Sequence, residues 1–309
     1  MTDFNDISAR VRQRFEFIEW RIFWTGRLNR RDLEAEFEIS TPQASLDLKT
    51  YLTRVPGNID YNATERAYLP RENFRPRFLV LSPERYLLQL QAITTNAIRK
   101  DDTWFASLPP VDVVPPIGRS PSADLIRPVV QAIKEGSELR IDYQSLEKSE
   151  PRTIYPHALA HDGFRWHVRA WSVERQKYRD FVLNRILAIG KPSPRTVTLP
   201  EDILWETYVT LSLISHPGLT DDQRAAVERD YQLENGKRTV SIRAALAFYF
   251  VRRHNLDLRN DQIPPERAQL WIDNYDEYEV DVSAAKEREE LLATMYRSTA
   301  SDEESGTSS

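Results

Sequence analysis

The sequence of 309 residues contains no cysteine and only nine glycines. Without cysteine the chain can form neither a disulfide nor a thiolate metal site, as is usual in a reducing compartment. The few glycines nowhere form the phosphate-binding loop on which nucleotide-binding enzymes depend. No apolar run approaches the roughly 20 residues of a membrane span, and the first residues lack a signal-peptide profile. These absences predict a cytoplasmic protein that makes no contact with a membrane.

Sequence motifs of enzyme chemistry are missing as well. No serine stands in a nucleophile elbow, and no His-Glu pair has the spacing of a metalloprotease. His157 and His161 are four residues apart, which on a helix would suit a metal, but Pro156 and the Asp162-Gly163 pair favour a strand and a turn. No third ligand lies near them in the sequence. We therefore expect no enzyme activity, no metal and no cofactor.

Acidic and basic residues are unevenly distributed along the chain, whose formal net charge is −5. From residue 201 onward, 12 Lys and Arg stand against 22 Asp and Glu. The first 200 residues carry the remaining 30 basic and 25 acidic residues, a balance of +5. Because charge acts locally, the first 200 residues can approach phosphate groups while the C-terminal part stays acidic.

The first 80 residues have the pattern of a DNA-binding head. Apolar residues recur at helical spacing from residue 7 to 25, and Asn29 can cap a second helix. Ser40 and Pro42 begin a third helix that runs to about residue 54. Residues 59–61 and 66–68 then have the pattern of two short strands around a turn. Three helices followed by a hairpin predict a winged helix-turn-helix domain.

The third helix and the hairpin supply the predicted DNA contacts. The candidates are Thr41, Gln43, Ser45, Lys49, Asn62, Thr64 and Arg66. Gln43 can read adenine in the major groove, whereas the other three helix residues suit phosphate. The alternative is a winged helix used for protein contacts, but the arginines that follow the hairpin favour DNA.

A second part of the chain links this head to the rest. Residues 84–99 are expected to form a connecting helix. Five prolines between residues 106 and 122 make that stretch extended, which predicts a domain boundary. Ser122 then caps a helix from Ala123 to Lys134 that leads into the central strands.

The central part of the chain has the pattern of a small antiparallel sheet. Strands are expected at residues 139–143, 154–161, 164–171 and 178–183. Apolar and polar side chains alternate in the first and third of them, and Asp162-Gly163 marks a hairpin. Arg179 and Arg185 share parity with two apolar residues, so strand geometry places two guanidiniums on one side. These arginines either stand at a solvated rim or converge on an anion.

The order and spacing of these strands resemble the WYL domain of bacterial transcriptional regulators. The resemblance is carried by Ile141-Asp142-Tyr143, Arg152 to Pro156, Trp166 to Ala170, Arg179-Asp180-Phe181 and Arg185-Ile186. His167 and Val168 stand where tyrosine and leucine are usual. In particular, the chain resembles the repressors found beside BREX and CBASS anti-phage systems. The resemblance implies a small Sm-like barrel with a basic, polar pocket that senses a ligand.

That resemblance places seven residues in the pocket. They are Tyr143, Ser145, Arg152, His157, Arg169, Arg179 and Arg185. Arginine offers a planar fork to phosphate, tyrosine a stacking face and serine a hydroxyl, a mixture that suits a nucleotide or a short single strand of nucleic acid. The alternative is a lattice of salt bridges with acidic residues of neighbouring strands, such as Asp180.

Beyond residue 200 the pattern is mixed. It predicts a strand at residues 205–213, a helix that Thr220 begins, and a strongly amphipathic helix at residues 239–254. The broad apolar surface of that last helix resembles the C-terminal dimerisation module of WYL proteins, although the same residues would equally fill a core. Residues 298–309 are polar and acidic, which predicts disorder.

Together these features predict an α+β multidomain fold. The expected parts are a winged helix-turn-helix head (1–80), a connecting helix and linker (81–122), a WYL domain with a Sm-like β-barrel (123–192), an α/β dimerisation domain (193–297) and a tail (298–309). The expected function is that of a homodimeric repressor that binds an inverted-repeat operator of double-stranded DNA, controls a phage-defence operon and senses a nucleotide or nucleic-acid ligand. The alternatives are an RNA- or nucleotide-binding adaptor that uses the barrel and, from a third class, a nucleotide-processing enzyme.

Overall fold

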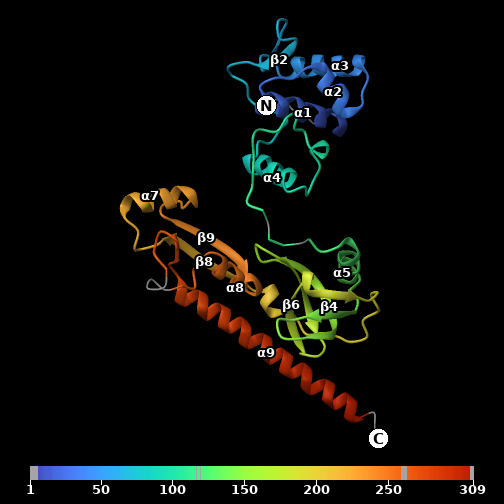
Figure 1. The fold of residues 1–309 in the computed structure, drawn as a ribbon, viewed down its shortest axis with the longest axis vertical. Helices are drawn as coiled ribbons and strands as arrows, with labels where there is room; N and C mark the ends of the chain where they lie inside the picture. The colour runs from blue at the N-terminus through green and yellow to red at the C-terminus, as the bar shows by residue number, and fades with distance from the viewer. Residues whose placement is uncertain (1–5, 116, 119, 259–262, 307–309) are drawn as a thin grey trace. The chain divides into compact units, whose positions relative to one another are not determined.

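The structure is a computed structural model that describes residues 6–115, 117–118, 120–258 and 263–306. The chain divides into two compact units, Met1–Pro116 and Ile117–Ser309, and the division falls inside the proline-rich stretch (Figure 1). None of the helices in the described ranges is long and apolar enough to span a bilayer.

The first unit holds a three-helix head with a hairpin, followed by a further helix. Its elements are α1 (Ala9–Thr25), α2 (Arg30–Phe37), α3 (Thr41–Arg54), β1 (Ile59–Asn62), β2 (Ala67–Pro70), α4 (Pro83–Thr94) and the 3-10 helix η1 (Lys100–Asp102). Ser8, Asn29 and Ser40 cap the first three helices, because each side chain accepts a backbone N–H of the first turn. The antiparallel pairing of β1 with β2 completes the predicted winged helix-turn-helix arrangement.

Two buried polar contacts hold α1 against the rest of the head. Arg14 donates two hydrogen bonds to Asp47 of α3, at 2.6 and 3.1 Å. The buried Glu19 accepts the backbone N–H groups of residues 77–79 and the hydroxyl of Tyr51, at distances between 2.7 and 3.0 Å. Burial raises the pKa of Glu19, although these donors act to lower it. The carboxylate therefore fixes the chain that follows the hairpin onto α1.

Helix α4 ends earlier than the sequence predicts. A helix is expected over residues 84–99, whereas α4 ends at Thr94 and Asn96 has a φ of 57°. A left-handed residue interrupts helical hydrogen bonding, and asparagine adopts this conformation more readily than most residues. Beside the helix end, Trp20 of α1, Leu90 of α4 and Phe105 form a small second core.

The second unit begins with α5 (Ala123–Glu135) and a five-stranded antiparallel sheet. Its strands are β3 (Leu139–Gln144), β4 (Ser149–His161), β5 (Trp166–Ser172), β6 (Lys177–Val182) and β7 (Ile186–Ile189). They pair in the order β6-β5-β4-β3-β7, so the chain passes from one edge to the other through the 3-10 helix η2 (Leu183–Arg185). Within the described residues no pairing joins β6 to β7. Four of these strands lie near their predicted places, although β4 begins at Ser149 and not at residue 154, and β7 is not predicted. The sheet is open and is not a closed barrel.

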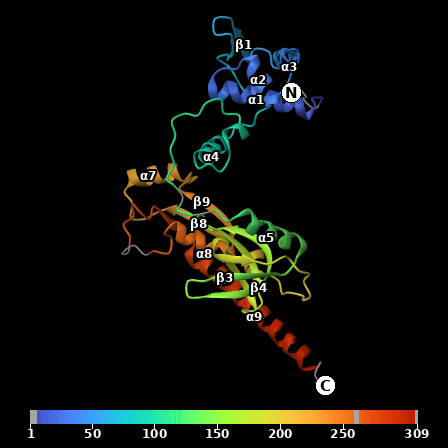
Figure 2. The same cartoon turned by 45° about the vertical axis from the view of Figure 1, so that its right-hand side comes forward.

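Side chains alternate along each strand, so the sheet presents two faces. Different helices cover the two faces. On one face, beside which α5 lies in Figure 2, Ile154 and Val168 form a core with Val129 of that helix. On the other face Trp171 packs edge-on against Tyr296 of α9 (Tyr275–Gly306), with ring centroids 5.1 Å apart. We call these the α5 face and the α9 face.

The remainder of the second unit is a smaller antiparallel sheet with helices around it. Its elements are α6 (Ile203–Glu206), β8 (Tyr208–Ser215), α7 (Asp221–Asp230), β9 (Lys237–Arg243), α8 (Ala244–Arg253), β10 (Leu270–Ile272) and α9. The strands pair in the order β10-β8-β9. Leu211 of β8, Val227 of α7, Ala247 of α8 and Val282 of α9 share one core.

Two predictions for this region are wrong in part. The strand expected at residues 205–213 begins only at Tyr208, after α6. The helix expected at residues 239–254 begins at Ala244, because residues 237–243 form β9 and pair with β8. Periodicity alone does not separate a short buried strand from a helix.

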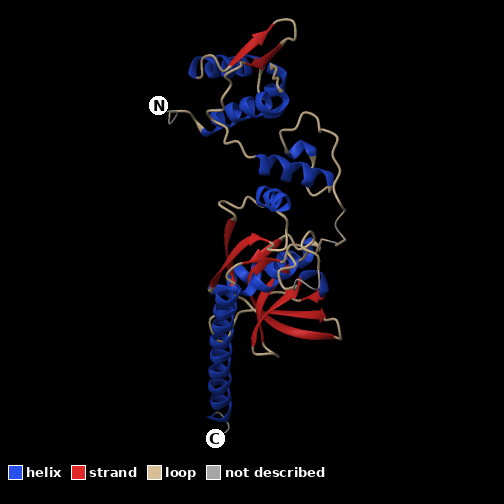
Figure 3. Cartoon of the chain, turned by 90° about the vertical axis from the view of Figure 1, so that its left-hand side faces the viewer, coloured by secondary structure: helices blue, strands red, loops and turns tan. Residues whose placement is uncertain are grey.

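The disorder expected of residues 298–309 stays a prediction. Helix α9 continues to Gly306 as one uninterrupted helix (Figure 3), while residues 307–309 lie outside the described residues. Once a helix is nucleated, each further residue adds a hydrogen bond at little cost, so it continues through polar sequence.

Candidate DNA interface and ligand pocket

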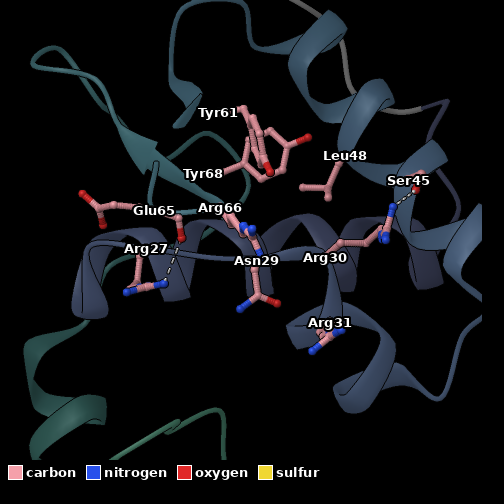
Figure 4. A pocket seen from close by; sticks show the side chains of 10 residues that line it. All are labelled: Arg27, Asn29, Arg30, Arg31, Ser45, Leu48, Tyr61, Glu65, Arg66 and Tyr68. Carbon is pink, nitrogen blue, oxygen red and sulfur yellow. Dashed lines mark hydrogen bonds between the residues drawn. The ribbon is translucent and has the colours of Figure 1, made fainter. Parts of the chain in front are cut away.

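A cleft of about 580 Å³ lies between α2, α3 and the hairpin of the first unit (Figure 4). Its lining is Arg27, Asn29, Arg30, Arg31, Ser45, Leu48, Tyr61, Glu65, Arg66 and Tyr68. Tyr61 and Tyr68 face each other across the hairpin, with ring centroids 5.2 Å apart. The cleft therefore combines the first turn of one helix, one side of α3 and a rigid aromatic pair.

The charge of this cleft is strongly positive, with four guanidiniums and one carboxylate in its lining. Arg30 donates to the hydroxyl of Ser45 at 3.4 Å, which keeps its guanidinium in the cleft (Figure 4). Arg31 and Arg66 form no ion pair with any residue that the structure describes. Guanidiniums beside the N-terminus of a helix form a site for phosphate oxygens. The cleft is therefore suited to a nucleic-acid backbone.

The sequence predictions include two of these residues, Ser45 and Arg66, and miss the arginines around the start of α2. The signal for them is present in the sequence, because Arg27, Arg30 and Arg31 flank the capping residue Asn29. A capped helix start with basic side chains is a recognisable anion-binding pattern.

The other predicted helix residues lie at different depths in α3. Thr41 and Lys49 are exposed. Gln43 is half-buried, and its side-chain amide donates to Asp47 at 3.0 Å. Because Asp47 is itself bonded to Arg14, a contact of Gln43 with a base would have to displace or share this hydrogen bond.

The predicted hairpin residues also divide into two kinds. The side-chain oxygen of Asn62 accepts the backbone N–H groups of Thr64 and Glu65, at 2.9 and 3.0 Å, so this residue shapes the turn. Thr64 and Arg66 are exposed, and Arg66 has a left-handed backbone with a φ of 51°. Of the three predicted hairpin residues, Thr64 and Arg66 are thus the two with exposed side chains.

A second cavity, of about 340 Å³, lies in the second unit where β3, β4 and β6 meet. It brings together five of the seven predicted ligand residues, and Lys148 and Arg175 also line it. The five are Tyr143, Ser145, Arg152, Arg179 and Arg185. Glu147 and Asp180 are its acidic residues. We call this cavity the basic pocket.

The basic pocket has one fixed aromatic wall and two free cations. The ring of Tyr143 lies edge-on to Phe181 at 5.1 Å, and its hydroxyl accepts a backbone N–H of β6 at 3.2 Å. Arg152 pairs with a glutamate of its own strand. Arg179 and Arg185 form no ion pair within the described part of the chain. Two such guanidiniums beside a fixed tyrosine can bind a phosphate group and the ring attached to it.

The structure does not bring the other two predicted ligand residues, His157 and Arg169, into the basic pocket. Arg169 stands opposite Asp180 in the register of β5 and β6, on the α9 face. Since neighbouring strand positions alternate, Arg179 belongs to the other face. His157 lies at a bulge in β4 and also belongs to the α9 face, where its ring packs against aromatic side chains. The prediction grouped side chains from opposite faces of one sheet.

Arg169 is the centre of a buried network of charges. Its side chain donates to both oxygens of Asp202 at 2.8 Å and to Asp180 at 3.3 Å, and it lies 3.8 Å from Glu289 of α9. His157 lies 2.8 Å from Asp202. We call these five residues the Arg169 network. The Arg169 network joins the five-stranded sheet to α6 and α9. Arg169 therefore forms salt bridges with acidic residues, which is the alternative to a place in the ligand pocket.

Burial governs the titration of this network. For Asp202, burial acts to raise the pKa, but the hydrogen bonds from Arg169 and His157 outweigh it and lower the pKa below its ordinary value. For Glu289, burial raises the pKa to about 7, and the neighbouring Asp202 carboxylate adds to the increase. Near neutral pH Glu289 therefore holds a proton that an exposed glutamate would have lost.

Replacing Glu289 with glutamine should remove a pH dependence of stability. In the folded chain Glu289 releases its proton around its pKa of about 7, whereas in the unfolded chain it does so around the ordinary pKa of 4.5. Between these two pKa values the free energy of unfolding of the wild type therefore falls by about 1 kcal/mol for each unit that the pH rises. Glutamine mimics the protonated acid, so urea unfolding of the variant should lack this loss. A wild type and a variant with parallel pH profiles would contradict the assignment.

Three family models match the chain in the order that the sequence predicts. The winged helix-turn-helix domain of the BrxR transcriptional regulator matches residues 10–92, and the WYL domain matches residues 124–190. The C-terminal dimerization domain of the BrxR transcriptional regulator matches residues 208–278. A solved structure of proteasome accessory factor B/C (PafBC) of Arthrobacter aurescens covers 93% of this chain and 51% of its own, at 16% identity and a TM-score of 0.23, which is too low to carry an argument.

Curated relatives cover most of the chain. The DNA-binding transcriptional repressor CapW of Escherichia coli (strain KTE188) is 36% identical over 86% of this chain and 89% of its own length. CapW of Pseudomonas aeruginosa is 38% identical over the same shares. CapW of Stenotrophomonas maltophilia is 36% identical over 87% of this chain and 93% of its own. With this identity over most of both chains, and with the three domains in the same order, the chain belongs to the CapW family of WYL-domain regulators.

Proposed function

We propose that this protein is a homodimeric, DNA-binding transcriptional repressor. The observation that carries the proposal is the cleft of the winged helix, where four arginines gather around the start of α2 and the hairpin. The relatives are named as DNA-binding transcriptional repressors, and the family model matched by the C-terminal part is that of a dimerization domain. The resemblance to repressors encoded beside anti-phage systems supports a phage-defence operon as the target.

The proposed docking follows from the places of the side chains. Helix α3 enters the major groove with Thr41 and Lys49 exposed, and Gln43 exchanges its bond to Asp47 for one to a base. The arginines of the cleft hold the backbone beside that groove. Thr64 and Arg66 of the hairpin reach the neighbouring groove.

We further propose that the basic pocket senses a nucleotide or a short single strand of nucleic acid. Arg179 and Arg185 would bind phosphate, and Tyr143 would hold a base or sugar. The crossover through η2 from one sheet edge to the other favours a Sm-like curvature of the sheet around this pocket. The ligand would prefer the arrangement of the dimer that does not fit DNA, which is how it would relieve repression.

Removing the free cations of the cleft tests the DNA part of this proposal. The logarithm of the DNA-binding constant falls linearly with the logarithm of the salt concentration. Replacing Arg31 and Arg66 together with glutamine should make this slope less negative, by about 0.9 for each lost phosphate contact. Fluorescence anisotropy with the DNA upstream of the gene, at several salt concentrations, measures this slope.

The matched control for this experiment is Arg99→Gln. The Arg99 side chain is 80% exposed and pairs with Asp102, outside the cleft. This variant should keep the wild-type slope. An unchanged slope in the double variant would move the interface away from the cleft. Equal wild-type affinity for upstream and random duplexes at physiological salt would reject the repressor altogether.

A further inference from the structure

A third cavity lies on the α9 face and shares two residues with the basic pocket. This cavity, of about 410 Å³, is lined by β6 together with Tyr249 of α8 and Glu289 of α9. Arg179 and Asp180, neighbours on β6, line both cavities. Adjacent strand residues point to opposite faces of a sheet. A rotation of β6 about its own axis would therefore move both side chains at once. Strand β6 is therefore the wall between the basic pocket and the C-terminal helices.

On the α9 face, Asp180 links β6 directly to α8. The hydroxyl of Tyr249 donates to the Asp180 carboxylate at 2.9 Å, and Arg169 donates to the same carboxylate at 3.3 Å. The ring of Tyr249 also lies 5.2 Å from that of the buried His167. Burial raises the pKa of Tyr249, and Asp180 adds to the increase, so its hydroxyl keeps its proton. One hydrogen bond thus connects the sheet to α8.

Strand β6 is one of the two edge strands of the five-stranded sheet. Among the described strands β5 is its one partner, and η2 follows it immediately. The two free guanidiniums of the basic pocket, Arg179 and Arg185, lie on either side of its C-terminal end. An anion bound by both would draw this end of β6 toward the basic pocket. Asp180, on the opposite side of the strand, would then move away from Tyr249.

We propose that the hydrogen bond between Asp180 and Tyr249 transmits occupancy of the basic pocket to the C-terminal helices, and that an anion bound by Arg179 and Arg185 breaks it. Tyr249 is a positioning residue in this relay and does not touch the ligand. Loosening α8 changes how the C-terminal part, which matches a dimerization domain, is held against the sheet. The relay rests on the ligand pocket proposed above.

The test compares the full-length wild type with Tyr249→Phe. The probes are ATP and a 5′-phosphorylated tetrathymidylate, which distinguish a nucleotide from a short single strand. Calorimetry measures their binding, and hydrogen exchange of the α8 amides measures the response. In the wild type a bound probe should speed exchange in α8. In Tyr249→Phe the probe should bind more tightly than to wild type, by about 2- to 10-fold, because no hydrogen bond has to be broken, while the response of α8 falls by about fivefold or more.

Tyr178→Phe is the matched control. Tyr178 also lies on β6, but its hydroxyl donates to the carbonyl of Pro200 at 2.7 Å, so its loss should leave the response of α8 intact. Two results would overturn the relay alone. One is a Tyr249→Phe variant in which a bound probe speeds α8 exchange as much as in wild type, and the other is a wild type in which a bound probe leaves α8 exchange unchanged. Failure of both probes to bind wild type, or equal binding by Arg185→Gln, overturns the ligand pocket and the relay with it.

Discussion

Replacing Arg169 with glutamine should destabilise the second unit by about 3–5 kcal/mol, the usual cost of removing one partner from a buried ion pair. Arg169 is 4% exposed, and its guanidinium is the main cation facing Asp202 and Asp180. Glutamine cannot neutralise these carboxylates, which would remain buried. Hydrogen exchange of the β5 amides in increasing urea measures the loss. The variant should also lose operator binding and ligand response together, because both require the folded second unit.

The control is Arg179→Gln, on the neighbouring strand. Arg179 is exposed and forms no ion pair among the described residues, so its loss should change stability by no more than about 0.5 kcal/mol. Only ligand binding should suffer. If Arg169→Gln instead kept full stability and lost only the ligand response, Arg169 would belong to a ligand site after all, as the sequence alone suggests.

Deleting one half of the inverted repeat from the operator should weaken binding by about 10²–10⁴-fold. In a dimer the second winged helix binds at the high effective concentration that the first one sets, and a single half-site forfeits this gain. Anisotropy titrations of full and half operators at one stated salt concentration measure the ratio. Sedimentation of the free protein at the same concentrations establishes whether it is a dimer.

The spacing of the half-sites provides the control for that experiment. Changing the spacer sequence at constant length should have little effect, whereas inserting about five base pairs places the half-sites on opposite sides of the duplex and should cost nearly as much as deleting one. A protein that bound full and half operators within about twofold of each other would be acting as a monomer.

The local sequence determines most of the elements of this chain. Capping residues such as Asn29 and Ser40 place the starts of the helices, because a side-chain oxygen at that position satisfies a backbone N–H that would otherwise lack a partner. Alternation of apolar residues and the Asp162-Gly163 turn place the central strands. Local signals fail at residues 239–243 and at the end of α4, where pairing with β8 and a left-handed asparagine decide the outcome.

The candidate sites depend on sheet register and packing between segments far apart in the sequence. The sequence by itself determined the winged helix, through its capping residues and periodicity. Its resemblance to WYL regulators implied the order of the three parts and seven ligand residues, five of which line the basic pocket. Only the tertiary structure decided that Arg169 faces Asp180 and Asp202, since Asp202 lies 33 residues away and strand register is a long-range property. It also gathered the arginines of α2 and the hairpin into one cleft, which no local pattern specifies.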